Sequence, residues 1–338
     1  MKKKTNYKYI LGIDISKKSL DICLTKDNKP IYQGKIDNTD QGLKMFQKKL
    51  KSLKISLEEV LFCCENTGIY TSPLLVFTEK NKLNLWVATP LAIKKSLGLT
   101  RGKSDKADAQ RIAQYAYRHE DQYQPWAPPK KSVKKLKNLW KCRRNILKIQ
   151  SQLRQNLTEV KSMQGEKAYK EIQRSYQGIL KGAEKDLKKV EKELEETLEA
   201  NKELQHLHQI ITSVDGVGTT TAIYLISLTD GFKTLNNPRK LACYAGVAPF
   251  QHSSGTSVRG KERVSPFADK ELKTLLHLCA VSVLKMKNGF TDFVKQKKEE
   301  GKHMMSILNS LRNKILHVIC ACVRRTVEYS MASSHLHF

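Results

Sequence analysis

The chain has 338 residues and is strongly basic, which narrows the classes of protein it can belong to. Lys and Arg number 61 against 33 Asp and Glu, giving a formal net charge of +28 at pH 7. An excess of this size indicates a polyanionic partner, either a nucleic acid or an anionic membrane. No stretch reaches the ~18 consecutive apolar residues of a membrane-spanning helix, so the sequence favours nucleic acid.

The hydrophobic content of 40% is enough for two domains with cores of ordinary size. The basic start Met1–Lys4 resembles a signal peptide, but the apolar run after it contains Asp14 and has no small-residue cleavage site. The eight cysteines show no paired C-x-x-C spacing, and most lie in apolar runs. They are therefore expected to be small core residues in a reducing compartment, and the protein is expected to be cytoplasmic.

The first third of the chain predicts an α/β domain of the RNase H type. Apolar runs predict five strands, three of them within residues 8–36 and the others at 60–65 and 83–88. Helices are expected at residues 41–51, after Tyr70 and from Asp105 onward. Three strands, a helix, and then alternating strands and helices form the order expected of an RNase H-type core.

Four acidic residues stand out because the predicted elements would bring them together. Asp14 ends one apolar strand and Glu65 ends another. Asp105 and Asp108 are three residues apart, a spacing that places both on one face of a helix. In a chain this basic, we expect such a cluster to be neutralised by divalent cations, because carboxylates that share a site repel one another.

A carboxylate cluster of this kind predicts phosphodiester chemistry. Two Mg²⁺ ions roughly 4 Å apart are what in-line displacement at phosphorus uses. The other interpretation is that Asp14 and Glu65 are only capping and turn residues. The metal site is favoured because the acids fall where an RNase H-type fold requires them. The first third therefore predicts a nuclease or a strand-transfer enzyme.

The segment Pro125–Pro129 breaks the chain and marks the expected end of the first domain, residues 1–125. Residues 130–210 carry apolar side chains at heptad-like spacing on both sides of Gly165. This pattern predicts two long helices joined near Gly165, either as a helical hairpin or as a coiled coil between chains. Asn201 falls near a buried heptad position, where it would fix the register.

Residues 211–330 predict a C-terminal domain that opens with a glycine turn between two apolar helices, as in a helix-hairpin-helix element. Gly216 and Gly218 would let backbone N–H groups approach a phosphate, with Thr219 at the start of the second helix. A tight interhelical turn with no ligand is the other interpretation. Helices are expected near the end of the chain at residues 272–287 and 307–325.

A polar, basic and glycine-punctuated segment at residues 244–261 predicts a long loop between helical segments. Long polar loops on a packed scaffold often carry function. A serine beside a glycine has an accessible Oγ, and Arg259 and Lys261 are close enough in sequence to hold a phosphate beside it. From spacing alone, a solvated serine-rich loop without a nucleophile is the more frequent case.

In this order, the motifs resemble those of the IS110-type insertion-sequence transposases, also called DEDD recombinases. The resemblance rests on residues 12–14, 65–68 and 103–109 in the front half, and on 216–222, 244–249 and 251–255 in the back half. It implies a RuvC-like catalytic domain over residues 1–125, a helical coiled-coil middle over 130–210, and a mostly α-helical transposase domain over 211–330.

The resemblance also implies roles for individual residues. Asp14, Glu65, Asp105 and Asp108 match the acids that bind Mg²⁺, two ions per site. Ser254 matches the nucleophile, and Ser253 replaces it if the alignment shifts by one. The family further implies donor and target DNA, a guide RNA encoded by the element, and a homo-oligomer, dimer or tetramer. An RNA-guided protein contacts backbones while base pairing reads sequence, which would account for much of the positive charge.

The segment 264–273 departs from the family pattern, in which a basic, glycine-containing stretch usually leads into Leu-Arg. Two other functions stay open. One is a RuvC-like, metal-dependent, structure-specific nuclease or junction resolvase that uses the same four acids with water as the nucleophile. The other is a nucleic-acid-binding protein without chemistry. A covalent protein–DNA adduct separates the transposase from the nuclease, and metal-dependent cleavage separates both from the third.

Overall fold

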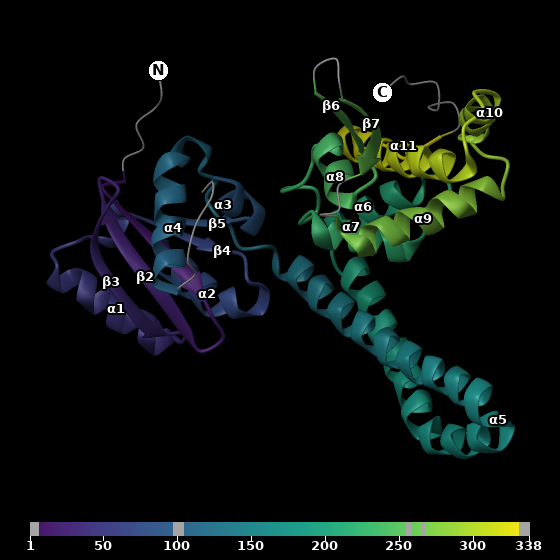
Figure 1. Cartoon of the computed structure of the whole chain (residues 1–338), viewed down its shortest axis with the longest axis horizontal. Helices are drawn as coiled ribbons and strands as arrows, with labels where there is room; N and C mark the ends of the chain where they lie inside the picture. The colour runs from purple at the N-terminus through teal and green to yellow at the C-terminus, as the bar shows by residue number, and fades with distance from the viewer. Residues whose placement is uncertain (1–6, 97–104, 255–257, 265–267, 331–338) are drawn as a thin grey trace. The chain divides into compact units, whose positions relative to one another are not determined.

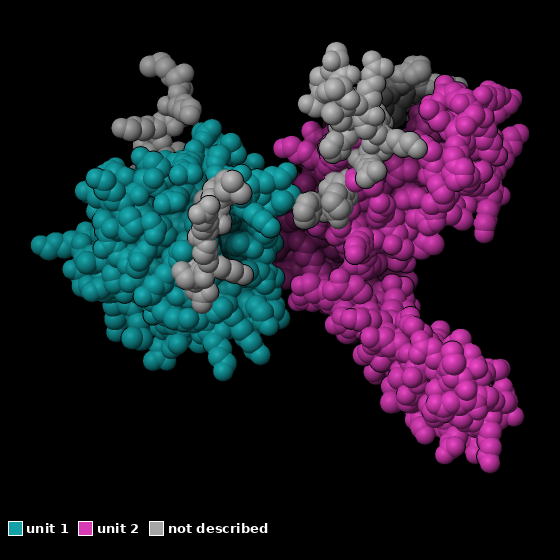
Figure 2. All heavy atoms as spheres, viewed as in Figure 1, with its two compact units in different colours: residues 1–128 teal, residues 129–338 magenta. Residues whose placement is uncertain are grey.

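The computed structural model describes residues 7–96, 105–254, 258–264 and 268–330. The chain divides into two compact units, residues 1–128 and 129–338 (Figures 1 and 2). The division falls between Pro128 and Pro129, inside the proline-rich segment that interrupts the helical pattern. No helix in the described ranges combines the length and the apolar character needed to cross a bilayer.

The first unit is built on a five-stranded mixed sheet in the order β3-β2-β1-β4-β5. The strands are β1 (Tyr9–Ile15), β2 (Ser19–Lys26), β3 (Lys29–Asp37), β4 (Val60–Glu65) and β5 (Leu85–Ala88). The first three form an antiparallel meander, and β4 and β5 continue the sheet parallel to β1. Asp27 and Asn28, both with positive φ, form the two-residue turn between β2 and β3. The predicted α/β architecture of this unit is confirmed.

Helices cover both faces of this sheet. They are α1 (Asp40–Ser52), α2 (Ser72–Lys80), α3 (Pro90–Ser96) and α4 (Asp105–Arg118), with short 3₁₀ turns at Leu57–Glu59, Gly68–Thr71 and Glu120–Gln122. Successive residues of the central strands alternate between two separate cores, because side chains in a strand point to opposite faces. Leu11 and Ile13 pack with α1 and α2, whereas Ile10 packs in the cluster of α3 and α4.

Helix α4 lies unusually close to β1, and Gly12 makes this approach possible. A Cβ atom added to Gly12 would lie 2.1 Å from the carbonyl oxygen of Ala109 and 2.4 Å from the backbone nitrogen of Ala113. Both neighbours are backbone atoms, so no side-chain rotation can relieve the contact. The small residues Ala109 and Ala113, both fully buried, complete the close packing from the helix side.

The second unit begins with α5 (Lys131–Glu199), which is broken at Gly165, where φ is 84° and ψ is −177°. The two helical halves meet at this residue, as the sequence predicts, and run back along one another. Ion pairs join them at Arg143–Glu191 and Arg154–Glu184, with N–O distances of 2.9 and 3.3 Å. Assembly of a coiled coil between chains stays a prediction.

Asn201 does not occupy the heptad position assigned to it from the sequence. It is the N-cap of α6, and its side-chain oxygen accepts a hydrogen bond from the backbone N–H of Leu204 at 3.1 Å. Asparagine is favoured at this position because its short side chain satisfies a free N–H of the first turn. The heptad pattern therefore ends with α5, before Asn201.

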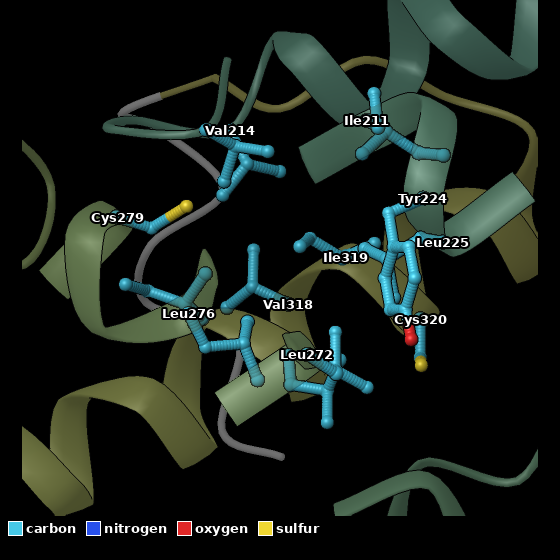
Figure 3. Packing of buried hydrophobic residues seen from close by; sticks show 14 of the residues in the cluster. Ile211, Val214, Tyr224, Leu225, Leu272, Leu276, Cys279, Val318, Ile319 and Cys320 are labelled. Carbon is cyan, nitrogen blue, oxygen red and sulfur yellow. The ribbon is translucent and has the colours of Figure 1, made fainter. Parts of the chain in front are cut away.

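The remaining helices pack around one apolar core, in which side chains of α6, α7, α9 and α11 meet (Figure 3). The helices are α6 (Lys202–Thr212), α7 (Thr219–Leu228), α8 (Pro238–Ala245), α9 (Lys270–Leu284), α10 (Thr291–Glu299) and α11 (Met304–Arg325). Helix α7 is buried on every side over residues 221–227. The short helix α10 was not expected, because Val294 is its one buried residue and its sequence shows little apolar pattern.

The predicted serine loop is a β-hairpin. Strands β6 (Pro249–Ser254) and β7 (Val258–Val264) pair antiparallel, from Pro249 beside Val264 to Ser254 beside Val258. The expectation of a long loop over residues 244–261 was therefore wrong where these two strands form. The hairpin is rich in polar residues, so the apolar alternation that reveals a half-buried strand is missing.

Replacing Gly12 with Ala should destabilise the first unit by about 3 kcal/mol, because overpacking against backbone forces α4 away from β1. The free energy of unfolding, measured by chemical denaturation and circular dichroism, tests this. Gly178→Ala is the matched control: Gly178 lies in α5 with open space around its Cα. There alanine should stabilise the helix by up to about 1 kcal/mol. Equal effects of the two substitutions would contradict the close approach at Gly12.

Candidate active site

Two of the predicted acids lie at neighbouring strand ends. Asp14 is the penultimate residue of β1 and Glu65 is the last residue of β4. These strands are parallel, and Ile13 is paired with Cys64, so the register brings Asp14 and Glu65 to the same edge of the sheet. Alternation places both on the face covered by α4, because Ile13 and Cys64 belong to the opposite core.

The third acid comes from the first turn of α4. Asp108 immediately precedes Ala109, the residue that contacts Gly12 two positions before Asp14. Burial, and then the nearby charge of Asp108, raise the pKa of Glu65 above its ordinary value. Asp108 also accepts a hydrogen bond from Arg111 Nη1 at 2.7 Å. The structure thus brings Asp14, Glu65 and Asp108 to one region of the first unit.

Asp105, the fourth predicted acid, is the first residue of α4, one turn before Asp108. Its side chain lies outside the described part of the structure. Among the side chains that are described, no three His, Cys, Asp or Glu residues form a group arranged to hold a metal ion. The described acids are therefore neighbours that share an electrostatic environment, and a closed ligand set is not formed by them alone.

A fifth carboxylate, which was not among the acids predicted from the sequence, lies beside this cluster. Asp21 on β2 is paired directly with Asp14 across the antiparallel ladder and is 4% exposed. Its carboxylate forms an ion pair with Lys35 of β3 at 3.3 Å. In the sequence, only its place between the apolar strand residues Leu20 and Ile22 marks Asp21 as a candidate site residue. Its position beside Asp14 follows from the register, which the sequence does not state.

The arrangement suits the binding of a hard cation. Carboxylate oxygens are the ligands that Mg²⁺ and Ca²⁺ prefer in proteins. Lys35 pairs with Asp21 and Arg111 pairs with Asp108. Glu65 has a raised pKa, first because it is partly buried and then because the charge of Asp108 repels it. A cation bound between these carboxylates would relieve that repulsion.

The serine segment lies in the second unit. Ser254 is the last residue of β6 and is paired with Val258, and Ser253 is paired with Arg259. The hairpin therefore brings the backbone of Arg259 next to that of Ser253, as the proximity in sequence suggested. Side chains of residues 251–263, which include Ser253, Ser254, Arg259 and Lys261, lie outside the described part.

The glycine turn of residues 216–218 combines two different constraints. Gly216 has φ of 77°, and an added Cβ would lie 2.6 Å from Val283 Cγ2 and 2.8 Å from the Cys279 carbonyl oxygen. This glycine is therefore needed for packing against α9. Gly218, by contrast, has open space around it and precedes α7 without a side-chain cap. The exposed Thr219 begins this uncapped helix.

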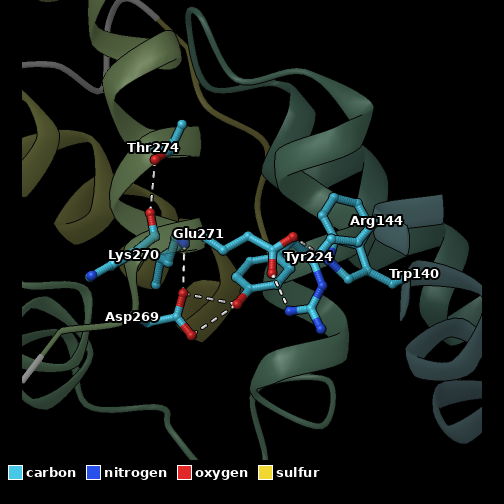
Figure 4. Close-up of polar contacts among 8 residues, drawn as sticks. Trp140, Arg144, Tyr224, Asp269, Lys270, Glu271 and Thr274 are labelled. Carbon is cyan, nitrogen blue, oxygen red and sulfur yellow. Dashed lines mark hydrogen bonds and ion pairs between the residues drawn. The ribbon is translucent and has the colours of Figure 1, made fainter. Parts of the chain in front are cut away.

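A polar network fixes the start of α9, just beyond the serine hairpin (Figure 4). Asp269 caps α9 at the N–H of Leu272 and accepts from the hydroxyl of Tyr224 at 2.9 Å. Glu271 accepts from Trp140 Nε1 at 2.9 Å and from Arg144 Nη1 at 3.2 Å. Burial, and then the Asp269 charge, raise the pKa of Tyr224. The segment 264–273 thus supplies two anchoring carboxylates, Asp269 and Glu271.

Two family models match this chain. Residues 11–160 match a family model described as a transposase, of the DEDD type of IS110. Residues 208–295 match a second model, described as the transposase IS116/IS110/IS902 family. The first range contains the four predicted acids and the second contains Ser254. The protein is thus an enzyme of the DNA transposase and recombinase class.

Relatives extend the match over most of the chain. The pilin gene-inverting protein of Moraxella bovis is 25% identical over 327 residues, which cover 94% of this chain and 96% of that protein. A protein of the same name from Moraxella lacunata matches equally. An uncharacterised 43.6 kDa protein of insertion element IS110 from Streptomyces coelicolor is 31% identical over 137 residues, 40% of this chain and 33% of its own length. The chain belongs to the IS110 family of transposases.

Among solved structures, Thermus thermophilus RuvC in complex with a Holliday junction substrate is similar to this chain. The sequence identity is 12% and the TM-score is 0.26, and the match covers 36% of this chain and 100% of RuvC. A second structure of the same RuvC matches over 35% of this chain with a TM-score of 0.25.

Replacing Tyr224 with Phe should lower the free energy of unfolding by about 1.5 kcal/mol, because the half-buried Asp269 carboxylate loses a hydroxyl donor. Thermal and urea denaturation measure the change. Tyr117→Phe provides the control, since Tyr117 is 43% exposed and should tolerate the loss of its hydroxyl. A Tyr224→Phe protein as stable as the control would show that the Tyr224–Asp269 hydrogen bond contributes nothing.

Replacing Glu65 with Gln should raise the melting temperature of the metal-free protein at neutral pH, by about 1–2 °C. The folded-state pKa of Glu65 is raised, so the folded protein binds more protons than the unfolded chain, and stability increases as pH falls through that pKa. At neutral pH the ionised carboxylate therefore opposes folding, and the amide removes this cost.

Added Mg²⁺ should raise the melting temperature of the wild-type protein more than that of Glu65→Gln, because the variant has lost one candidate ligand. The exposed Glu58 supplies the control, and Glu58→Gln should respond to Mg²⁺ as the wild type does. If Glu65→Gln has a lower melting temperature than the wild type without metal, and Mg²⁺ raises it as much as that of the wild type, Glu65 is not a ligand of the site.

Proposed function

We propose that this protein cuts and rejoins DNA strands through a serine nucleophile, Ser254, and a Mg²⁺-binding acidic cluster, under the guidance of an RNA encoded by its element. The observation that supports the proposal most is the convergence of Asp14, Glu65 and Asp108 at one edge of the first unit's sheet. Folding alone does not require this convergence, because acids that approach one another repel and so oppose the folded state.

The metal would be held by Asp14, Glu65, Asp105 and Asp108. The donor set fits, since carboxylate oxygens suit Mg²⁺ and the charge of Asp108 lies near Glu65, where it adds to the effect of burial in raising the Glu65 pKa. When bound, Mg²⁺ supplies stabilisation of the charge that develops on the phosphoryl and leaving oxygens. Arg111 would orient the Asp108 carboxylate, and Lys35 would pair with the buried Asp21 beside Asp14.

Ser254 would carry the strand through the reaction. Its Oγ forms a bond to the DNA phosphorus, the bond from phosphorus to one strand end breaks, and the serine proton ends on the departing DNA hydroxyl. Attack by the hydroxyl of another strand reverses the step and releases the serine. The phosphoserine bond conserves the energy of the broken phosphodiester, so rejoining needs no other energy source. A serine hydroxyl is a weak nucleophile alone, so it requires the acidic site.

Several residues of the second unit are proposed to hold the nucleic acid. The start of α7 at Thr219, which follows Gly218 and has no side-chain cap, would bind a phosphate through backbone N–H groups of its first turn, supported at the turn by Gly216. Arg259 and Lys261 on β7 would hold the phosphate near Ser254. The net charge of +28 suits a guide RNA as well as donor and target DNA. A homo-oligomer, dimer or tetramer, is proposed to form through residues 130–210.

A recombination assay tests the proposal. Wild-type protein is given donor and target DNA with Mg²⁺, with and without RNA from the flanking element, and joined product and denaturant-stable protein–DNA adduct are measured. Both Asp14→Asn and Ser254→Ala should lose joined product by more than about 100-fold, as expected when a ligand or nucleophile is removed. Ser254→Ala should also lose the adduct while it still binds RNA.

Two matched variants serve as controls. Asp40→Asn removes an exposed acid at the start of α1, and Ser253→Ala removes the neighbouring serine; both should keep their activity. If Ser253→Ala loses the adduct and Ser254→Ala does not, the nucleophile is Ser253. Cleavage that needs Asp14 but ignores both serines and the RNA would replace the proposal with a RuvC-like nuclease that uses water. That alternative draws on the same acidic cluster.

A further inference from the structure

One face of α11 is polar along its whole middle, and the acidic cluster and the serine hairpin do not account for it. Its members recur at helical spacing and share a hydrogen-bonding or cationic side chain: Ser306, Asn309, Ser310, Asn313, Lys314 and His317. The spacing of three and four residues places them in one stripe. The opposite face, which includes Leu311, Ile315 and Ile319, is buried in the core.

This stripe forms the floor of a groove of about 690 Å³. One wall is the base of the serine hairpin, where Pro249 and Val264 are paired. The other wall is α10 with Phe293 and Lys297. The groove therefore leads along α11 to the foot of the two strands, the first of which ends at Ser254. The rise of the helix from Ser306 to His317 gives the floor a length of about 16 Å.

The charge of the groove has one sign. Among the described side chains, three lysines line it, Lys297, Lys302 and Lys314, and no Asp or Glu does. Lys297 and Lys314 lie over the same Phe293 ring, with nitrogen–centroid distances of 5.9 and 5.1 Å. Lys297 is paired with Glu300 at 2.7 Å. In the described part of the chain, Lys302 and Lys314 have no carboxylate within ion-pair distance, so their charges are available to a ligand.

This combination matches a repeating anion better than a small one. Serine, asparagine and lysine side chains are among the groups that contact phosphate and sugar oxygens in nucleic-acid complexes. A polar floor along about three helical turns presents donors in a row, as a strand of linked phosphates would require. Asn309 already uses one donor within the protein, since its Nδ2 donates to the Val247 carbonyl at 3.0 Å. This hydrogen bond connects the floor of the groove to the segment that leads into the hairpin.

We propose that this groove, bounded by α10, α11 and the base of the β6–β7 hairpin, binds the sugar–phosphate backbone of a nucleic-acid strand and leads it to the hairpin. The inference extends the proposed function, but it does not require Ser254 to be the nucleophile or the acids to bind metal. Backbone contacts of this kind carry no sequence preference, so binding should depend on phosphate charge and on salt.

Fluorescence anisotropy with the full chain tests the groove, using 20-nucleotide single-stranded DNA, duplex DNA and single-stranded RNA over a range of salt. The double variant Lys302→Gln with Lys314→Gln should bind about tenfold more weakly on at least one probe. Its slope of log affinity against log salt should be smaller by about 1–2, because each lysine that neutralises a phosphate adds about one unit to the slope. Lys285→Gln with Lys287→Gln removes the same charge from exposed positions outside the groove.

A second variant separates the groove from the general charge of the protein. Ser310→Phe fills the floor and leaves the net charge unchanged, so it should weaken binding to the same probe as the lysine pair. DNA whose phosphates are replaced by neutral methylphosphonates should bind the wild type more weakly than ordinary DNA does, and on this probe the lysine pair should cause little further loss. A loss of affinity confined to DNA probes, or to RNA, identifies the strand that occupies the groove.

The proposal fails if both lysine pairs weaken binding equally, because the effect then belongs to net charge. It also fails if Ser310→Phe binds all probes like the wild type while it remains folded by circular dichroism. The recombination assay reports separately on Ser254 and Asp14, so a failed groove leaves the proposed function standing, and a failed nucleophile leaves the groove standing.

Discussion

The close contact between α4 and β1 at Gly12 is the constraint on which the first unit depends. Only a residue without a Cβ allows the backbone of Ala109 and Ala113 to approach the strand at this distance. Since Asp14 follows Gly12 on the same face of β1 and Asp108 precedes Ala109 in α4, the contact also determines how near the two carboxylates come. The absence of a side chain at Gly12 therefore determines both the packing of α4 on β1 and the spacing of the acids in the candidate active site.

Electrostatics divides the acids of this site into two kinds. Asp21 and Asp108 have cationic partners in Lys35 and Arg111, so their charge is largely compensated within the protein. Glu65 has a raised pKa, because burial and the Asp108 charge both oppose its ionisation. A further basic side chain beside Glu65 would relieve this repulsion without a ligand. The proposed metal site rests on this repulsion, because a bound cation would relieve it.

In the second unit, the polar network at the start of α9 connects elements that are far apart in sequence. Trp140 and Arg144 of α5 contact Glu271, and Tyr224 of α7 contacts Asp269 (Figure 4). Strand β6 follows α8 and strand β7 precedes α9, so the hairpin is flanked in sequence by two helices that pack in the core of this unit. The groove beside α11 depends on the same core, because its floor is the polar face of α11 and the opposite face of that helix is buried in the core.

Local patterns in the sequence were sufficient for the five strands of the first unit, for its helices α1, α2 and α4, and for the positions of Asp14 and Glu65 at strand ends, because period and strand length are properties of short segments. They also located the break at Gly165. The short helix α3 was not predicted. Asp21, the hairpin at Ser254 and the groove on α11 were decided by the tertiary structure alone. Each depends on which residue of one segment lies beside which residue of another, and strand register and helix packing are set by contacts between segments distant in the chain.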